Sequence, residues 1–289
     1  MKSKTVYPLG MTIKAAIFTL CADDFGLKKS VNDGVIDLVR RGRLNAVSCM
    51  SGGDSFEAGV GQLLKAANDA EHDVKIGLHL TMSEYAPLTQ MPKLAPHGVL
   101  PTINQALISS HISRLDRREI ALEIEAQIDR FVSIMGRLPD FVDGHQHVHL
   151  LPMVRSCLID CIQTKGLSGF VRLCDDKGRA GKAIKTMILS RLSKKMGKLL
   201  DCTDIAHNDV FLGVNAFDPS EDFPLLMQGW LKQAAIASDW PLIMCHPAFA
   251  PYADEAAIHD PIQNRRVDEW TYLASDAFKS DMQAVGLKF

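Results

Sequence analysis

Two patterns of apolar and polar residues recur along the chain. Short continuous apolar runs predict strands, and apolar residues at helical spacing predict helices. Short apolar runs at residues 15–22, 46–50, 74–80, 169–173 and 241–246 predict buried strands. Segments with apolar residues at helical spacing lie at 30–42, 56–70, 117–135, 153–165, 225–237 and 268–285. A recurrent order of strand and helix is typical of parallel βα units. We therefore expect a single α/β domain over residues 1–289, with residues 1–12 irregular because they carry neither period.

The stretch that begins at Phe141 departs most clearly from the apolar pattern. It carries three of the ten histidines of the chain at alternating positions, His145, His147 and His149, with Asp143 in the same register. Side chains two residues apart point to the same face of an extended strand. A strand continuing from Phe141 would therefore direct an acid and up to three imidazoles to one side. This arrangement predicts a metal site or a site of proton transfer rather than a packed core.

Polar side chains also lie on or after the other predicted strands. These residues are Asp23, Asp24, His79, Arg172 and His246. In a barrel of parallel strands the carboxyl ends meet at one face, where catalytic residues collect. One aspartate and two histidines form a usual ligand set for a catalytic metal ion that keeps positions open for water. A remaining aspartate and histidine would supply a base and an acid, so the set predicts metal-assisted hydrolysis of an amide or an ester.

Two further segments differ from the strand and helix pattern. Residues 81–104 contain four prolines and little periodicity, which predicts a long loop, and long loops in compact domains are often functional. Residues 177–200 are rich in lysine and arginine and carry apolar residues at helical spacing. They predict an inserted basic amphipathic helix with one buried stripe and a solvated face. Such a helix can alternatively lie on an anionic membrane surface, and the sequence leaves both interpretations open.

Composition narrows the class of protein. The chain has 289 residues, of which 47% are hydrophobic and 23% charged, as in ordinary globular proteins. A formal net charge of -2 gives no general basis for binding nucleic acid. The seven cysteines are odd in number and form no Cys-x-x-Cys pair, which favours reduced thiols and a cytoplasmic location. The apolar run at 15–22 leads into two acids rather than a cleavage site, so a strand is favoured over a signal peptide.

Five short motifs occur in order along most of the chain. They are Ala22-Asp-Asp-Phe-Gly-Leu27, Val31-Asn-Asp-Gly34, Gly77-Leu-His-Leu80, Asp143-Gly-His-Gln-His-Val-His149 and Cys245-His-Pro-Ala248. Together they resemble the YdjC-like carbohydrate deacetylases, a family that includes chitooligosaccharide deacetylase and members from hopanoid biosynthesis. The resemblance implies a distorted (β/α) barrel with parallel strands and one divalent metal ion, magnesium or zinc. It also implies removal of an N-acetyl group from a sugar, an oligosaccharide or a glycolipid.

The resemblance implies a set of metal ligands. Asp24 and His79 match the positions of two ligands in the family motifs. The third ligand is expected from the histidine run, where the motif favours His145 and leaves His147 as the alternative or as a neighbour of the substrate. A metal-binding histidine also needs an acceptor for its other nitrogen, and Asp143 could supply one.

The resemblance also implies the reacting groups. Asp23 matches the general base and His246 the general acid, while Arg172 would orient the base or bind substrate. The expected partner is an N-acetylated carbohydrate, and the sequence is compatible with membrane contact through 177–200 and with a homo-oligomer.

Two other functions remain alternatives. A metal- and glycan-binding protein without turnover would not need a separate base and acid. A metal-dependent hydrolase of another bond, such as a phosphoester, would need several arginines converging on the site, and only Arg172 is a clear candidate.

Overall fold

Parallel strands form the centre of the protein. The computed structural model describes residues 16–111, 115–177, 184–218, 220–237, 240–255 and 260–289. The strands of the main sheet are β2 (Thr19–Phe25), β3 (Ala46–Cys49), β4 (Lys75–Leu80), β5 (Phe141–Gly144), β6 (Phe170–Val171), β7 (Val210–Leu212) and β8 (Pro241–Cys245). They lie in the order β6-β5-β4-β3-β2-β8-β7, and neighbouring strands are parallel. The prediction of an α/β fold with parallel strands is confirmed.

The sheet curls into a distorted (β/α) barrel, because its two edges approach one another. At the end of β6 the backbone N–H of Val171 donates to the carbonyl of Ala206 at 2.9 Å, and beyond β6 the carbonyl of Asp175 accepts from the backbone N–H of Phe211 at 3.0 Å. The side chain of Asn208, which is fully buried, also donates to the carbonyl of Leu173 at 2.9 Å. Irregular backbone and one amide side chain therefore join β6 to β7, where a regular barrel would have a continuous ladder.

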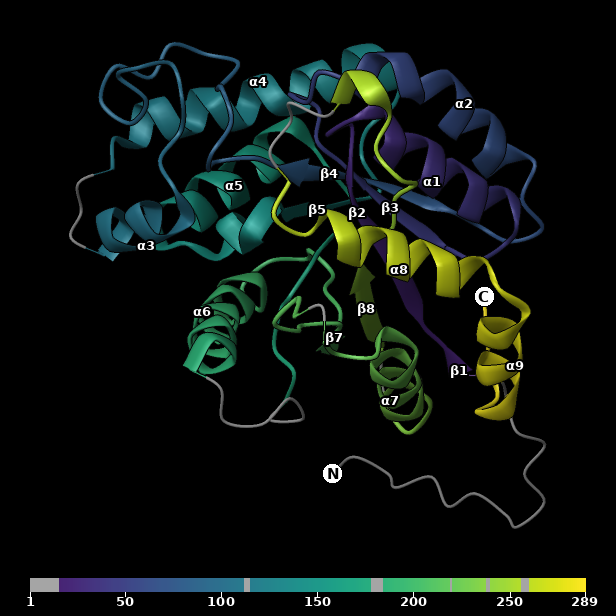
Figure 1. The fold of residues 1–289 in the computed structure, drawn as a ribbon. Helices are drawn as coiled ribbons and strands as arrows, with labels where there is room; N and C mark the ends of the chain where they lie inside the picture. Colours follow the sequence, from purple (N-terminus) through teal and green to yellow (C-terminus); the bar gives the residue numbers. More distant parts are fainter. Residues whose placement is uncertain (1–15, 112–114, 178–183, 219, 238–239, 256–259) are drawn as a thin grey trace, which may run out of the picture.

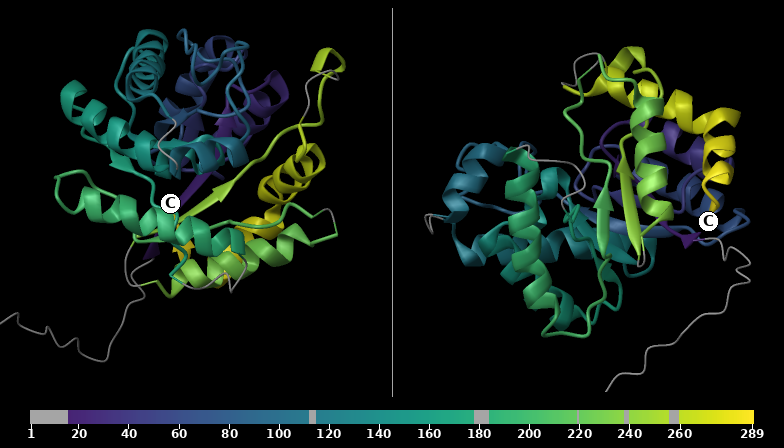
Figure 2. Two further views of the ribbon diagram at one scale, coloured as in Figure 1. Left: turned by 90° about the vertical axis from the view of Figure 1, so that its left-hand side faces the viewer. Right: turned by 90° about the horizontal axis from the view of Figure 1, so that it is seen from below.

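Helices surround the strands (Figures 1 and 2). They are α1 (Lys29–Arg40), α2 (Phe56–Asn68), α3 (Ile103–His111), α4 (Arg117–Met135), α5 (Pro152–Lys165), α6 (Ile184–Leu200), α7 (Phe223–Ala235), α8 (Gln263–Ala274) and α9 (Asp276–Ala284). The bounds of α4 are those that the apolar spacing predicts. Asp116 caps its first turn by accepting from two backbone N–H groups, and Gly136 ends it at φ 71°.

Several predicted elements differ from the structure. The predicted strand at 15–22 is a two-residue β1 (Ala16–Ile17) followed by β2, which continues through Asp23 and Asp24 to Phe25. β1 pairs instead with β9 (Leu287–Lys288) near the end of the chain. The predicted helix at 268–285 is two helices, because Ser275 is extended and its side chain caps α9. α3 and the three-residue β7 have too little periodicity to be predicted.

The segment at 177–200 forms a helix in its second part. Helix α6 begins at Ile184, and residues 178–183 lie outside the described residues, as do residues 1–12. A buried stripe is present, formed by Leu189, Leu192, Met196 and Leu200. Of the residues that the helical spacing assigned to the stripe, Leu192 and Met196 are buried, whereas Met187, Ile188 and Leu199 are exposed. Within the described ranges, no helix is both long enough and apolar enough to cross a membrane.

The histidine run is not a strand, so the prediction that its alternate side chains share one face is wrong. Strand β5 ends at Gly144, and residues 145–150 form a short 3₁₀ segment. Within it Gln146 (φ 50°) and His147 (φ 61°) adopt the left-handed conformation, which ends the extended backbone and turns successive side chains in different directions.

Candidate active site

An irregular end of β2 brings two adjacent acids to the same site. The pairing of β2 with β3 shifts between Ala22 and Phe25, and Asp24 adopts φ 68° within this irregularity. In a regular strand the side chains of Asp23 and Asp24 would point to opposite faces. Here both line one pocket, although both are almost completely buried. A local irregularity of this kind redirects a side chain at the end of a strand.

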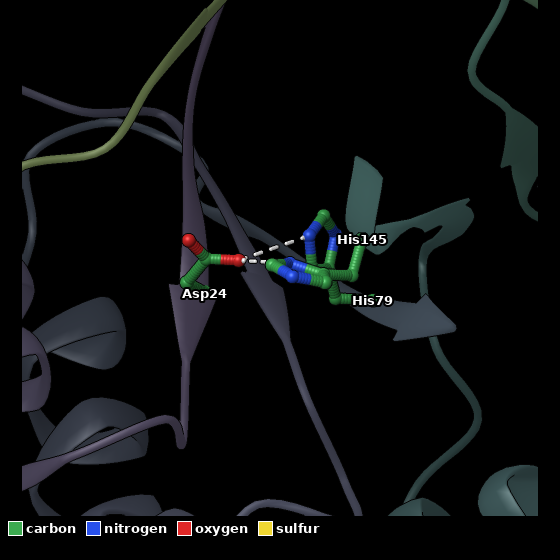
Figure 3. A group of neighbouring side chains, drawn as sticks. All are labelled: Asp24, His79 and His145. Carbon is green, nitrogen blue, oxygen red and sulfur yellow. Dashed lines mark hydrogen bonds and ion pairs between the residues drawn. The ribbon is translucent and has the colours of Figure 1, made fainter. Parts of the chain in front are cut away.

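Asp24, His79 and His145 form a group that could hold a metal ion. Oδ1 of Asp24 lies 3.3 Å from Nε2 of His79 and 2.9 Å from Nδ1 of His145. One ligand atom from each residue lies within 4.8 Å of the others. Figure 3 shows the two imidazoles directed at the same carboxylate oxygen. The side chains come from β2, from β4 and from the first residue after β5.

The other two histidines of the run lie elsewhere. Nδ1 of His147 is 3.5 Å from Sγ of Cys174, and its ring packs edge-on against Phe211. His149 is fully buried, and its Nε2 donates to the carbonyl of Arg172 at 2.9 Å. Of the two predicted candidates for the third ligand, His145 is therefore the one that the structure places beside Asp24 and His79, while His147 lines the same pocket.

The chemistry of this group fits a bound cation. Nδ1 of His79 lies 2.7 Å from Oδ1 of Asp143, which accepts its proton and leaves the Nε2 lone pair facing Asp24. Burial alone would lower the pKa of His79, but the carboxylates of Asp143 and Asp23 raise it to about 10. The surrounding carboxylates therefore favour a positive charge at this position. Two imidazole nitrogens and one carboxylate oxygen are donors suited to zinc and similar divalent ions.

Arg266 of α8 holds the second oxygen of Asp24. Its Nη2 lies 2.7 Å from Oδ2 of Asp24, and its Nε lies 2.8 Å from Asp260, which also pairs with Lys28. Burial raises the pKa of Asp24, but Arg266 and His145 bring it well below its usual range. Oδ1 of Asp24, which faces His79 and His145, therefore remains available to a metal ion. Sequence reasoning missed Arg266, because an arginine within a helix carries no local signal of a buried role.

Arg172 fixes the predicted base. Its guanidinium contacts both oxygens of Asp23, at 2.6 and 2.7 Å, and also Oδ2 of Asp143 at 2.5 Å. Arg172 is fully buried and does not line the pocket, whereas Asp23 does. Of the two predicted roles for Arg172, orientation of the base agrees with this position and contact with substrate does not.

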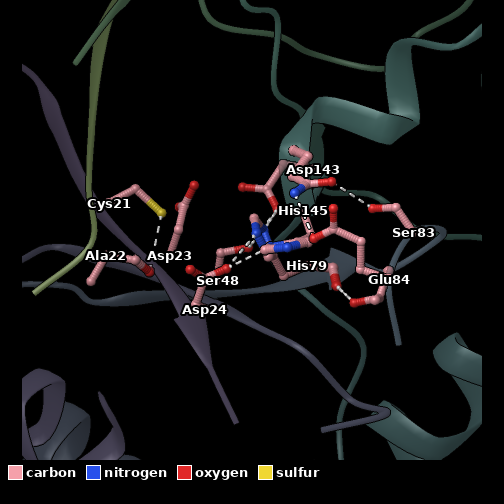
Figure 4. A network of polar contacts seen from close by, with 12 residues as sticks. Cys21, Ala22, Asp23, Asp24, Ser48, His79, Ser83, Glu84, Asp143 and His145 are labelled. Carbon is pink, nitrogen blue, oxygen red and sulfur yellow. Dashed lines mark hydrogen bonds and ion pairs between the residues drawn. The ribbon is translucent and has the colours of Figure 1, made fainter. Parts of the chain in front are cut away.

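Asp143 and Ser48 support the site from behind. Asp143 joins Arg172 to His79, and Oγ of Ser48 contacts both Asp143 and Nδ1 of His79 (Figure 4). Both residues are fully buried. Ser48 was not predicted, since a serine within a short apolar strand has no distinguishing pattern.

His246 follows β8 and faces the same pocket. Its backbone N–H donates to the buried Glu269, and its ring packs edge-on against Phe217. Burial lowers the pKa of His246 to about 4, against the opposing effect of Asp24 and Asp23. The imidazole is therefore neutral at neutral pH in the metal-free protein.

A pocket of about 790 Å³ lies over these residues. Six of the predicted residues line it, namely Asp23, Asp24, His79, His145, His147 and His246. The predicted loop at 81–104 supplies much of one wall, including Tyr85 and Leu100. The volume is in the usual range for sites that bind small ligands.

Comparison with known proteins identifies the family. A family model described as YdjC-like protein matches residues 18–284. The chain belongs to the YdjC-like family. The resemblance seen in the five motifs is thereby confirmed.

Relatives in this family have curated names. The chain is 31% identical over 259 residues to the chitooligosaccharide deacetylase of Yersinia pestis strain Pestoides F, which covers 89% of this chain and 90% of that protein. It is 32% identical over 133 residues to the chitooligosaccharide deacetylase of Escherichia fergusonii, covering 46% of this chain and 50% of that protein. Among solved structures, one from Enterococcus faecalis V583, described as a proposed cellobiose-phosphate cleavage protein, superposes with a TM-score of 0.74 at 20% identity. It covers 95% of this chain and 96% of that chain, and the likeness concerns the fold.

Proposed function

We propose that the protein is a metal-dependent carbohydrate deacetylase that removes the N-acetyl group of an N-acetylated sugar. The observation that carries this proposal is the Asp24, His79 and His145 group at a pocket that also contains Asp23 and His246. A metal site of this kind beside a separate acid and base is suited to hydrolysis. The named deacetylases of the family support the reaction.

Asp23 is the proposed general base. Burial raises its pKa, but Arg172 holds the pKa of this carboxyl far below its usual range, so Asp23 is ionised at neutral pH. A strongly held carboxylate is a weak base. A metal ion at the adjacent group would polarise the acetyl carbonyl and lower the pKa of its bound water, which makes a weak base sufficient. Arg172 keeps both oxygens of Asp23 in fixed positions for the transfer.

His246 is the proposed general acid. In the hydrolysis the oxygen of water bonds to the carbonyl carbon, the C–N bond breaks, and the proton of the water ends on the departing amine. With a pKa of about 4, the protonated imidazole of His246 is a strong acid toward that amine. Because the neutral imidazole has no proton to give, the proton that Asp23 takes from the water must pass to His246 before the imidazole donates it to the amine.

The two alternative functions have weaker support. A phosphoesterase would need cationic side chains available to the substrate. Among the described pocket residues Arg266 is the single arginine, and two of its three guanidinium nitrogens, Nη2 and Nε, contact Asp24 and Asp260. A binding protein without turnover would not need the fixed pair of Arg172 and Asp23 at the edge of the metal group.

Metal, substrate and location complete the proposal. Zinc and magnesium are the proposed ions, and the nitrogen-rich donor set favours zinc. Chitooligosaccharides are the proposed substrates, because the related deacetylases are named for them. The free thiols of the described cysteines agree with a cytoplasmic location.

Helix α6 carries the proposal of membrane contact. Its exposed side combines basic and apolar residues, namely Met187, Ile188, Arg191, Lys194, Lys195, Lys198 and Leu199. Such a face can bind an anionic lipid surface. Sedimentation with anionic and with neutral vesicles tests this, and equal absence from both pellets would reject it. Light scattering after gel filtration tests the homo-oligomer.

Acetate release tests the main proposal. The metal-free protein is supplied with zinc or magnesium and assayed on N-acetylglucosamine, on chitooligosaccharides and on N-acetylated glycolipids. We expect metal-dependent release of acetate from at least one chitooligosaccharide and none with Asp23→Asn. Absence of release from all of them, in protein that binds metal, would contradict the proposal.

A further inference from the structure

One wall of the pocket is built from residues 81–102, which we call the wall segment. Five of its residues line the pocket, namely Glu84, Tyr85, Val99, Leu100 and Thr102. The segment contains no helix or strand. Its backbone N–H groups must therefore find acceptors outside regular secondary structure. Where those acceptors lie decides whether the wall is fixed or moves as a lid.

Helix α4 supplies acceptors from three consecutive turns. Glu119, Glu123 and Gln127 are spaced four residues apart, so they lie on one face of the helix, and all three are buried. Oε1 of Gln127 accepts from the backbone N–H of Thr81 at 2.9 Å, and its Nε2 donates to the carbonyl of Thr81 at 2.7 Å. The start of the wall segment is thus bonded to α4 through both of its backbone groups.

Glu123 holds the next part of the segment. Its Oε1 accepts from the backbone N–H of Leu88 at 3.0 Å and from Nε2 of Gln127 at 2.8 Å. Its Oε2 accepts from the backbone N–H of Thr89 at 2.8 Å and from the hydroxyl of Thr89 at 2.7 Å. Glu123 is completely buried, and these four donors satisfy its carboxylate.

Glu119 repeats this arrangement one turn earlier in α4. Its two oxygens accept from the backbone N–H groups of Lys93 and Leu94, each at 3.0 Å. The three side chains of α4 therefore bind five backbone N–H groups of the wall segment, which runs antiparallel to the helix. A carboxylate accepts stronger bonds from N–H groups than a neutral oxygen does, so the two glutamates hold the segment firmly.

The bonded part of the segment is connected to the part that faces the pocket. The backbone N–H of Leu100 donates to the carbonyl of Tyr85 at 2.9 Å, and that of Glu84 donates to Pro101 at 3.1 Å, which joins the two pocket-facing stretches. The ring of Tyr85 packs edge-on against His145, with centroids 5.5 Å apart. A shift of the wall segment on α4 would therefore change the surface that a sugar meets beside the metal group.

We propose that Glu119, Glu123 and Gln127 are positioning residues that fix the wall segment on α4 as a preformed binding surface for the sugar. A surface that is ordered before the substrate arrives lowers the entropic cost of binding. The ligand atoms of the metal group come from other segments, so these three residues act on substrate binding rather than on the metal. This inference rests on the proposed deacetylase function and concerns the same site.

Glu123→Gln is the main variant. A glutamine replaces one oxygen by an NH2 group, which opposes two of the four donors whichever way the amide turns. Glu119→Gln is a second variant, which opposes one of two backbone N–H groups and perturbs the segment at another place. Glu125→Gln is the matched control, because Glu125 lies on a different face of α4, where its charge acts on Cys161 of α5.

Hydrogen exchange of the zinc-loaded protein without sugar tests whether the wall is preformed. We expect the amides of residues 88, 89, 93 and 94 to be protected in the unchanged chain. Glu123→Gln should accelerate exchange of residues 88 and 89 by at least about tenfold, and Glu125→Gln should leave it unchanged. Unprotected exchange at these residues in the unchanged chain would identify a mobile lid and overturn the proposal.

The kinetics of acetate release test whether the wall serves the substrate. On a chitooligosaccharide, Glu123→Gln and Glu119→Gln should raise KM at least about fivefold, because only part of the population has the wall in place. We expect kcat and the Kd for zinc to change by less than about twofold. Reduced stability with KM unchanged, or a fall in kcat alone, would show a merely structural role and overturn the proposal.

Activity separates this proposal from the function on which it rests. If acetate is released and KM is the same in Glu123→Gln and in the unchanged chain, the positioning role fails and the deacetylase stands. If metal-loaded protein releases no acetate, the deacetylase fails, and the comparison is made on the Kd of the disaccharide of N-acetylglucosamine by calorimetry. Weaker binding to Glu123→Gln would then support the positioning role, whereas equal binding or none would overturn it.

Discussion

Asp143→Asn is the sharpest test of how the metal group is held. One oxygen of Asp143 accepts from His79 at 2.7 Å, and the other contacts Arg172 at 2.5 Å. An asparagine has the same shape but must direct its NH2 group to one side or the other. If the NH2 faces Arg172, two donors oppose each other. If it faces His79, the imidazole must carry its proton on Nε2, which is the atom that faces Asp24.

The magnitude follows from these contacts. Loss of an acceptor that orients a metal-binding histidine weakens metal binding about 10- to 100-fold, or about 1.4–2.8 kcal/mol. Arg172 also loses one of its two buried carboxylate partners. The loss of this buried ion pair should reduce the free energy of unfolding of the metal-free protein by about 3 kcal/mol.

Titration calorimetry with zinc at fixed pH measures the change in metal binding. Urea unfolding of the metal-free protein measures the change in stability separately. Asp140→Asn is the matched control, because Asp140 contacts the backbone of Ile76 and the side chain of Arg137, away from the metal group. It should lower stability without changing the Kd for zinc. A folded Asp143→Asn variant that binds zinc as tightly as the unchanged chain would refute the reasoning.

Three further predictions concern other residues of the site. Asp23→Asn should keep the Kd for zinc and lose acetate release, because its amide cannot accept the proton of water. His145→Gln should weaken zinc binding by at least about tenfold, whereas His147→Gln should leave it nearly unchanged. The unchanged chain should lose stability as the pH rises from about 4.5 to 8, and Glu269→Gln should abolish this loss; urea unfolding at several pH values measures both.

The sign of the pH effect follows from the proton of Glu269. Burial raises the pKa of this carboxyl from 4.5 to about 8 in the folded protein, although His246 and Arg266 oppose the change. The unfolded chain releases the proton above about pH 4.5, while the folded chain keeps it to about pH 8. Stability attributable to Glu269 is therefore present below pH 4.5 and declines as the pH rises to 8, by roughly 5 kcal/mol in total.

Each of the three has an outcome that contradicts it. Full activity of Asp23→Asn would place the base elsewhere. Zinc binding lost in His147→Gln and kept in His145→Gln would exchange the roles of the two histidines. An equal decline with pH in Glu269→Gln and in the unchanged chain would show that Glu269 is ionised throughout this range.

Most strands and most helices could be predicted from apolar runs and helical spacing, and the main site residues could be predicted because they interrupt or follow such runs. Polar residues such as His79 and His246 stand out beside apolar runs. Helix α4 has apolar residues at helical spacing and a capping residue at each end. The pattern could not reveal the break at Ser275 or the irregular closure beyond β6, since both depend on contacts with segments distant in sequence.

The supporting residues of the site are beyond prediction for a different reason. Ser48 lies in an apolar strand and Arg266 in a helix, where each residue type is ordinary. What distinguishes them is a buried polar partner from another strand or helix, since a buried charge without such a partner is strongly unfavourable. The sequence indicates that a buried Asp24 carboxylate needs a polar or cationic partner, but it does not identify the residue that provides one.

The histidine run illustrates how a correct site can follow from an incorrect local structure. Alternating spacing predicted three imidazoles on one face, but the left-handed Gln146 and His147 separate them after His145. Neither residue is glycine, so nothing in the sequence marks the turn. Each such conformation costs about 1–3 kcal/mol and persists only where other contacts hold it. Ser83 and Glu84 supply those contacts for Gln146, which joins the wall of the pocket to the strand end that carries a metal ligand. The turn that invalidates the alternating pattern therefore leaves His145 at the metal group and places Gln146 in the wall of the pocket.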